Sequence, residues 1–184
     1  MAPSMFTAPQ AKDQDQTIQD RRPVVTSGPS GVGKGTLAQK LGEVEGVSYY
    51  FVSVSEFESL ISHDAFVEYT LFSGHYYGTS KRTISEQTAK GAVVLLDIEM
   101  QGLKRMKMHS GFDARYIFIK PPSMEVLEAR LRSRGTETEE SIQKRLMQTQ
   151  AELEYAKTPG VHDIVIVNDK IEEAFQKLEN YIFG

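Results

Sequence analysis

The stretch GPSGVGKGT at residues 28–36 sets the narrowest limit on what this chain can fold into. It follows the short apolar run PVVTS and precedes a helical segment that runs from Lys34 to about Leu41. Gly28, Gly33 and Lys34 fit the spacing G-x-x-x-x-G-K, in which small residues let backbone N–H groups surround phosphate oxygens and the lysine adds a positive charge. The order of strand, glycine-rich loop and helix therefore predicts a phosphate-binding loop in an α/β fold.

A hydroxyl and a carboxylate are expected near this loop. The residue after the lysine is usually Ser or Thr in this pattern, whereas here it is Gly35 and the hydroxyl follows at Thr36. Asp97 ends the apolar run VVLLD, where a carboxylate can meet a metal-bound water, although an aspartate that caps a turn fits the same position. The loop residues expected to line the phosphates are Gly28, Ser30, Gly31, Val32, Gly33, Lys34, Gly35 and Thr36.

Strands and helices are expected to alternate along the rest of the chain. Strands are expected at 23–27, 49–54, 65–72, 92–99, 114–120 and 163–167, and the last three are apolar enough to be covered on both faces. Helices are expected at 34–41, 55–62, 79–90, 123–134, 139–157 and 170–183, with a capping box of Ser55 and Glu58 and a turn at 73–78. This order predicts a mostly parallel α/β sheet flanked by helices, with a small two-stranded insertion after the first helix.

Composition bounds the number of domains and the classes of partner. A chain of 184 residues, 40% hydrophobic and 25% charged, fits one globular domain. A formal charge of −4 gives no general basic field for nucleic acid or an anionic membrane, and no apolar run approaches the roughly 20 residues of a membrane helix. The absence of cysteine excludes disulfides and thiolate chemistry. Residues 1–21 are acidic and poor in apolar residues, which predicts a disordered tail rather than a mitochondrial presequence, with the cytoplasm as the expected compartment.

The chain resembles guanylate kinases, the P-loop nucleoside monophosphate kinases that transfer the γ-phosphate of ATP to GMP and give ADP and GDP in purine metabolism. The resemblance runs from Arg22 to Gly184 and rests on SGPSGVGKGT, YYFVS, FVEYTLFSGHYYGT, LLDIEMQG, ARYIFIKPPS, RLRSRGTETEESIQKRL, AELEYA and HDIVIVND. It implies a P-loop NTPase-type parallel sheet with core segments 22–41, 78–125 and 159–184, a truncated GMP-binding lobe at 42–77 and a helical lid at 126–158. It also implies Mg²⁺ bound with ATP, for which Asp97 could act through water and no other protein ligand is expected.

The resemblance assigns the ATP side of the site motif by motif. It implies that Lys34 and the lid arginines Arg130, Arg134 and Arg145 stabilise the transferred phosphate, and that Asn168 lies near adenine. Closure of such a lid brings cations to the charge that develops during phosphoryl transfer and excludes water.

The GMP side is assigned in the same way. The resemblance implies that Tyr49 and Tyr77 contact the GMP phosphate, whereas Glu68 and Glu99, assisted by Thr79, accept hydrogen bonds from the guanine edge. Guanine presents its N1–H and its N2 amino group as donors, which carboxylates can accept.

One segment of the family pattern is absent between Leu41 and Gly42. Guanylate kinases continue there into another strand and a Ser-x-Thr-Thr-Arg-x-x-Arg-x-Gly-Glu segment, whose serine helps to read guanine and whose two arginines clamp the GMP phosphate. This chain has no arginine between Lys34 and Arg82. The break resembles a skipped exon, an alternative transcript or a faulty gene model, and it is expected to leave a sheet edge uncovered.

Three functions remain open at this stage. The first is a guanylate kinase whose acceptor site is weakened. The second is a non-catalytic guanylate-kinase-like binding module of the kind found in membrane-associated scaffolds, which have degraded phosphate loops, unlike the loop with Lys34 here. The third is an isoform that binds ATP and does nothing else. The oligomeric state stays open as well.

Overall fold

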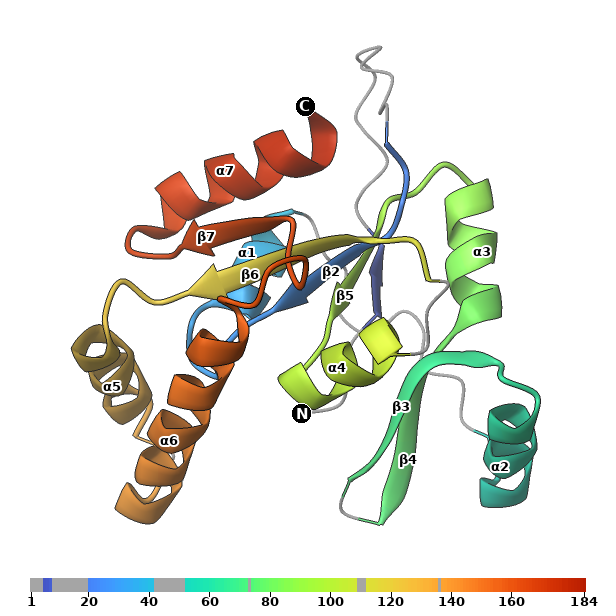
Figure 1. The fold of residues 1–184 in the computed structure, drawn as a ribbon, viewed down its shortest axis with the longest axis horizontal. Helices are drawn as coiled ribbons and strands as arrows, with labels where there is room; N and C mark the ends of the chain where they lie inside the picture. The colour runs from blue at the N-terminus through green and yellow to red at the C-terminus, as the bar shows by residue number, and fades with distance from the viewer. Residues whose placement is uncertain (1–4, 8–19, 42–51, 73, 109–111, 136) are drawn as a thin grey trace.

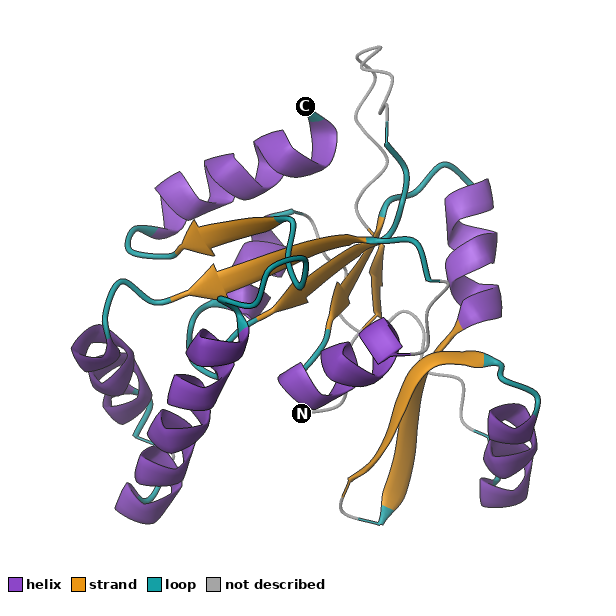
Figure 2. Cartoon of the chain, viewed as in Figure 1, coloured by secondary structure: helices purple, strands orange, loops and turns teal. Residues whose placement is uncertain are grey.

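The computed structural model describes residues 5–7, 20–41, 52–72, 74–108, 112–135 and 137–184. Its centre is a five-stranded sheet in the order β1-β5-β2-β6-β7 (Figures 1 and 2). The strands are β1 Met5–Thr7, β2 Val24–Ser27, β5 Val94–Asp97, β6 Arg115–Lys120 and β7 Ile164–Val167. All neighbouring pairs are parallel except β1 with β5, which is antiparallel. The prediction of a mostly parallel α/β sheet is confirmed.

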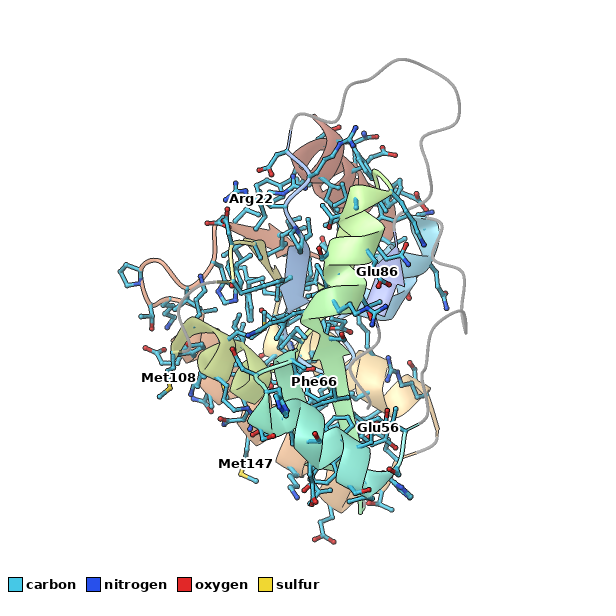
Figure 3. The ribbon with its side chains drawn as sticks, turned by 90° about the vertical axis from the view of Figure 1, so that its right-hand side faces the viewer. Arg22, Glu56, Phe66, Glu86, Met108 and Met147 are labelled. Atoms are coloured by element: carbon cyan, nitrogen blue, oxygen red, sulfur yellow. The ribbon has the colours of Figure 1, made fainter. Side chains whose placement is uncertain are left out.

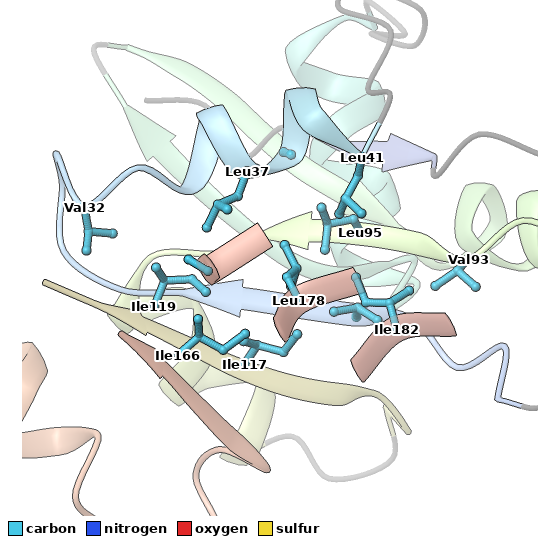
Figure 4. Packing of buried hydrophobic residues seen from close by; sticks show 13 residues of the cluster. Val32, Leu37, Leu41, Val93, Leu95, Ile117, Ile119, Ile166, Leu178 and Ile182 are labelled. Carbon is cyan, nitrogen blue, oxygen red and sulfur yellow. The ribbon is translucent and has the colours of Figure 1, made fainter. Parts of the chain in front are cut away.

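Helices cover both faces of this sheet. Helices α1 (Lys34–Lys40) and α7 (Ile171–Phe183) pack on one face, and α3 (Lys81–Ala89) and α4 (Met100–Met108) supply buried residues to the other. The first layer is the larger hydrophobic cluster, in which Leu37 of α1 and Leu178 of α7 meet inward-facing residues of the strands (Figure 4). Successive strand residues point to opposite faces, so β5 sends Leu95 to this cluster and Leu96 to the other. Helix α4 was not predicted.

The last strand differs from its prediction. Strand β7 was expected to be covered on both faces, but Val165 is 46% exposed and Val167 is 37% exposed, whereas Ile166 is buried. The reason is its position, because β7 lies at the end of the strand order. An apolar run such as DIVIV does not distinguish an edge strand from a central one.

Two expectations about the N-terminal segment change with strand β1. Residues 1–21 were predicted to be a disordered tail, yet Met5–Thr7 forms a strand. It pairs with β5 in the register Met5 with Leu96 and Thr7 with Val94. The absent segment was expected to leave a sheet edge uncovered, but β5 is paired on this side, because β1 provides the backbone hydrogen-bonding groups that an edge strand lacks.

A second, two-stranded sheet extends from the central one. It consists of β3 (Phe66–Phe72) and β4 (His75–Ser80), called here the acceptor hairpin. The segment 73–78 was predicted to be a turn and the next helix to begin at 79, so β4 was missed and α3 begins later than predicted. The backbone of β4 pairs with β3, which overrides the turn signal of its glycines.

Helix α2 (Val54–Ser62) packs against the acceptor hairpin. Its Phe57 stacks on Phe66 of β3 at 4.4 Å between ring centroids and on Tyr76 of β4 at 5.0 Å, and Phe66 lies beside α2 in Figure 3. Helix α2 begins one residue earlier than predicted, because Ser53 and not Ser55 accepts the hydrogen bond that caps its N-terminus. The predicted strand 49–54 is wrong at residues 52–54, and its residues 49–51 lie outside the described part of the chain.

The predicted lid helices are present as α5 (Met124–Ser133) and α6 (Glu139–Tyr155). Ser123 and Thr138 cap their N-termini, and Leu127 and Leu131 pack with Ile142 in a separate small cluster. Helices α5 and α6 and the acceptor hairpin extend from the same side of the sheet, with α4 between them (Figure 1). Met108 and Met147, 79% and 68% exposed, project from α4 and α6 (Figure 3). No helix in the described part of the chain is long and apolar enough to cross a membrane.

Candidate functional site

The predicted phosphate loop links β2 to α1 at the carboxyl end of the parallel strands. Gly33 has a φ of 100°, and a Cβ there would lie 2.4 Å from Nδ2 of Asn168. Gly28 approaches the backbone of β6 so closely that a Cβ would lie 2.1 Å from the Ile119 carbonyl oxygen. Gly33 is required for its backbone conformation, and Gly28 is required because no side chain fits in the space beside β6. The loop and its lysine therefore have the geometry that the sequence pattern predicted.

Lys34 points its ammonium group back over the loop. Its Nζ donates to the Gly28 carbonyl oxygen at 2.7 Å and lies 3.8 Å from Oδ1 of Asp97. Burial raises the pKa of Asp97, and the charge of Lys34 opposes that rise. The end of β5 thus places a carboxylate next to the loop lysine, as predicted.

Of the three predicted lid arginines, one contacts the phosphate loop and another contacts the segment that follows β7. Arg145 of α6 donates from Nη1 to Oγ of Ser30 at 2.5 Å and from Nε to Glu137 at 2.5 Å. Arg130 of α5 donates to the carbonyl oxygens of Asn168 at 2.9 Å and Asp169 at 3.0 Å. Arg134 is exposed at the C-terminal end of α5.

Asn168 is buried behind the loop. It is 3% exposed, and its Nδ2 donates to the Val32 carbonyl oxygen at 2.8 Å. Its Oδ1 is buried and has no hydrogen-bond partner among the described residues. The residue therefore supports the loop backbone.

The acceptor hairpin carries the predicted carboxylate and hydroxyls on one face. Glu68 of β3 lies opposite Thr79 of β4, and Thr70 lies opposite Tyr77, so these four residues alternate onto the same side of the hairpin. Glu68 is 6% exposed and accepts a hydrogen bond from Oγ1 of Thr79 at 3.3 Å. Burial raises the pKa of Glu68 to about 7. Near neutral pH this carboxyl is therefore close to half protonated.

Glu99 lies between β5 and α4, where its carbonyl oxygen accepts the hydrogen bond of Leu103 N–H. The side chain is exposed, and its charge contributes to raising the pKa of Glu68, Asp97 and Glu152. The Glu99 carboxylate thus lies within electrostatic reach of both the phosphate loop and the acceptor hairpin. Tyr49, the remaining predicted residue of the GMP side, lies outside the described residues.

Glu152 is a buried carboxylate that the sequence reasoning missed. Its side chain is 5% exposed on α6 and accepts a hydrogen bond from Gln148 at 2.9 Å. Burial raises the pKa of this carboxyl, and the charge of Lys34 offsets part of that rise. With Ile142 and Thr149 it forms the buried stripe of the helix. That helical spacing was a signal that could have identified it.

The donor groups at the site suit a metal ion that is held mainly by its nucleotide. Within the described ranges no group of three or more His, Cys, Asp or Glu side chains is arranged to hold a metal ion. Asp97 is the carboxylate at the end of β5 beside the loop. Mg²⁺ keeps several waters and binds through one or two carboxylates plus phosphates, so this donor set fits it.

Comparisons with known proteins relate the chain to one family. A family profile described as guanylate kinase matches residues 36–184. The guanylate kinase of Schizosaccharomyces pombe is 44% identical over 179 aligned positions, which cover 86% of this chain and 88% of that protein. The guanylate kinase of Homo sapiens is 41% identical over 181 positions, covering 86% and 90% of the two chains.

A solved structure shares the fold. The crystal structure of guanylate kinase from Anaplasma phagocytophilum superimposes with a TM-score of 0.58 at 31% sequence identity, covering 88% of this chain and 84% of that one. The similarity in fold and the similarity in sequence therefore both extend over most of the chain. This chain belongs to the guanylate kinase family.

Proposed function

We propose that this chain is an ATP:GMP phosphotransferase by descent that retains its ATP site and binds the GMP phosphate weakly. The observation that carries the proposal is the contrast between two halves of one site. The phosphate loop has Lys34 and Arg145 beside it, whereas the acceptor hairpin presents Glu68, Thr79 and Tyr77 and no arginine of its own.

On the donor side, the chain's own residues suit phosphoryl transfer from ATP. The backbone of the loop and Nζ of Lys34 would hold the β- and γ-phosphates, and Arg145 would stabilise the negative charge that develops on the transferred group. Asn168 would lie near the adenine, as the resemblance implies, and its hydrogen bond to the Val32 carbonyl oxygen would support the loop. Asp97 would orient Mg²⁺ through water, and that ion supplies charge neutralisation on the phosphates when it is bound. The attacking phosphate oxygen is already anionic, so no general base is required.

On the acceptor side, the hairpin suits the guanine base. Glu68 and Glu99 would accept hydrogen bonds from N1–H and the N2 amino group, and Thr79 keeps one oxygen of Glu68 in place. Adenine offers an acceptor at N1, so an ionised carboxylate there disfavours it. Tyr77 would meet the GMP phosphate with a neutral hydroxyl.

The lengths of the alignments support a deletion in this chain. The alignment with the S. pombe protein runs over 179 positions, whereas 86% of 184 residues is about 158. A difference of this kind is what a deletion in this chain would give, and it supports the proposal that a segment is absent between Leu41 and Gly42. Helix α1 ends at Lys40, directly before that junction.

The expected loss of GMP affinity follows from the missing cations. A hydrogen bond to a charged group contributes about 1.5 to 3 kcal/mol, so two absent arginines remove about 3 to 6 kcal/mol, or a factor on the order of 10² to 10⁴ in the dissociation constant. Tyrosine hydroxyls do not replace that charge.

Thermal shift with three ligands tests the proposal. Mg·ATP is expected to raise the Tm of the chain, and GMP is expected to raise it no more than guanosine does, because the phosphate adds little binding. A GMP shift far above the guanosine shift would mean that other residues bind the phosphate. The absence of any ATP shift would favour the non-catalytic module over the enzyme.

A further inference from the structure

Gly102 is a glycine inside a helix without a conformational reason to be one. It is the third residue of α4, its φ is not positive, and it is buried. A glycine within a helix is destabilising relative to alanine, because it loses more backbone freedom on folding. Its presence therefore calls for an explanation from the space around it.

That space is filled from two directions. A Cβ on Gly102 would lie 2.8 Å from Cγ2 of Ile98 and 3.3 Å from Oε2 of Glu68. The first distance is shorter than side chains tolerate, and the second would push on the carboxylate. Helix α4 thus meets strand β3 at the point where Glu68 turns its second oxygen toward the helix backbone.

The two oxygens of Glu68 are consequently fixed by different elements. Oε1 accepts the hydrogen bond from Thr79 of β4, and Oε2 lies against Gly102 of α4. The charged groups that act on this carboxyl are Arg105, also on α4, and Glu99, which precedes that helix. A carboxylate held from both sides has little freedom to adjust to a base that presents other donors.

We propose that Gly102 is a positioning residue for base recognition, because its missing side chain lets α4 hold the Glu68 carboxylate in the orientation that reads guanine. The inference rests on the proposed function and names the residue that sets the specificity of its acceptor site. Gly102 would touch no part of the nucleotide and would act only through Glu68.

The test begins on the protein without ligand. The Glu68 carboxyl is titrated by ¹³C NMR in the wild-type chain, in Gly102→Ala and in Gln101→Ala, a neighbouring exposed position on the same helix turn. We expect the pKa of Glu68 to rise by at least about half a unit in Gly102→Ala, since the methyl group would push the carboxyl away from the Thr79 hydroxyl whose hydrogen bond lowers that pKa, and to stay unchanged in Gln101→Ala.

Guanosine binding provides the second readout. Gly102→Ala is expected to weaken guanosine binding about tenfold or more while leaving the ATP affinity within about twofold. In a Glu68→Gln background the same substitution should change guanosine affinity by less than about twofold, because a residue that acts through Glu68 has no effect once the carboxylate is gone. Equal losses in both backgrounds would overturn the proposal and assign Gly102 a structural role.

A double variant guards against a general packing defect. Ile98→Leu removes the Cγ2 branch at similar volume, so Ile98→Leu/Gly102→Ala relieves the 2.8 Å contact and keeps the one with Glu68. It should fold like Ile98→Leu alone and still lose guanosine affinity. If the wild-type chain fails to bind guanosine while it still binds ATP, the proposed base recognition itself is wrong. If guanosine binds normally to Gly102→Ala and the Glu68 pKa is unmoved, only the positioning role is wrong.

Discussion

Guanosine binding to this chain is expected to tighten about tenfold between pH 6 and pH 8, because the proposed function makes an ionised Glu68 the acceptor for the base. Burial raises the pKa of Glu68 to about 7. At one unit below this pKa about a tenth of the carboxyl is ionised, and at one unit above it about nine-tenths is. Guanosine is the appropriate probe, since it carries no phosphate that titrates in the same range.

The same shift makes folding stability depend on pH in a defined direction. The unfolded carboxyl has a pKa near 4.5 and the folded one a pKa of about 7, so the folded protein binds the proton more tightly. This contribution to stability is fully present below pH 4.5 and is lost as the pH rises through 7, at a total cost of about 3 kcal/mol. Glu68→Gln is therefore expected to be more stable than the wild type at pH 8, with a much smaller difference near pH 4.

Two measurements check these expectations together. Isothermal titration calorimetry gives the guanosine dissociation constant at each pH, and urea unfolding gives the free energy of unfolding of both proteins in the same buffers. In Glu68→Gln the tenfold dependence of guanosine affinity should disappear. A wild-type affinity that is flat or falls between pH 6 and 8 would refute the role of the Glu68 carboxylate as the acceptor.

Three further outcomes follow from the described contacts. Lys34→Ala should weaken ATP binding about 10- to 100-fold, whereas Lys40→Ala, which removes an exposed ion pair with Glu172, should leave it within about twofold in the same fluorescence titration. Arg145→Ala should reduce ATP affinity about tenfold or more, because it removes the guanidinium group beside Ser30. Arg132 is an exposed arginine of the preceding helix, and Arg132→Ala should leave the ATP affinity unchanged. Burial lowers the pKa of His162 to about 4 from 6.5, so the folded state favours the neutral imidazole that contacts Ser27. Stability should therefore fall by about 3 kcal/mol as the pH drops from 6.5 through 4, and His162→Gln should flatten that part of a urea-unfolding profile.

The central sheet was predictable because its strands carry strong local signals. Strands β5 and β6 contain unbroken apolar runs, and the glycine spacing before Lys34 fixes the loop between β2 and α1. Such signals depend on burial on both faces and on backbone geometry, which the sequence itself specifies.

Elements defined by tertiary contacts were predicted less well. HYYGTS contains a glycine and follows another, so it looked like a turn, but pairing with β3 makes it β4. Helix α4 includes Gly102, which weakens its helical signal, and its packing on Glu68 compensates. The sequence SVSEFE offers two capping registers, Ser53 with Glu56 and Ser55 with Glu58, and only the structure distinguishes them.

The site residues were predicted by motif, while their partners came from the fold. Arg130 donates hydrogen bonds to the backbone carbonyl oxygens of Asn168 and Asp169, and no pattern of side chains in the sequence predicts backbone acceptors. Glu152 is separated from Lys34 by more than a hundred residues, so its electrostatic contact with the loop lysine depends on where the lid lies. Long-range placement of this kind is not encoded in local spacing.

The most direct test is ADP formation by the purified 184-residue chain with ATP and Mg²⁺, with and without GMP. The proposed absence of two phosphate-binding arginines predicts ATP binding without an appreciable GMP-dependent rate at GMP concentrations that saturate the S. pombe protein, and a gain in rate only at concentrations on the order of 10² to 10⁴ higher. GMP-dependent turnover comparable to that of the S. pombe protein under the same conditions would contradict it and would show that the acceptor site is complete without the absent segment.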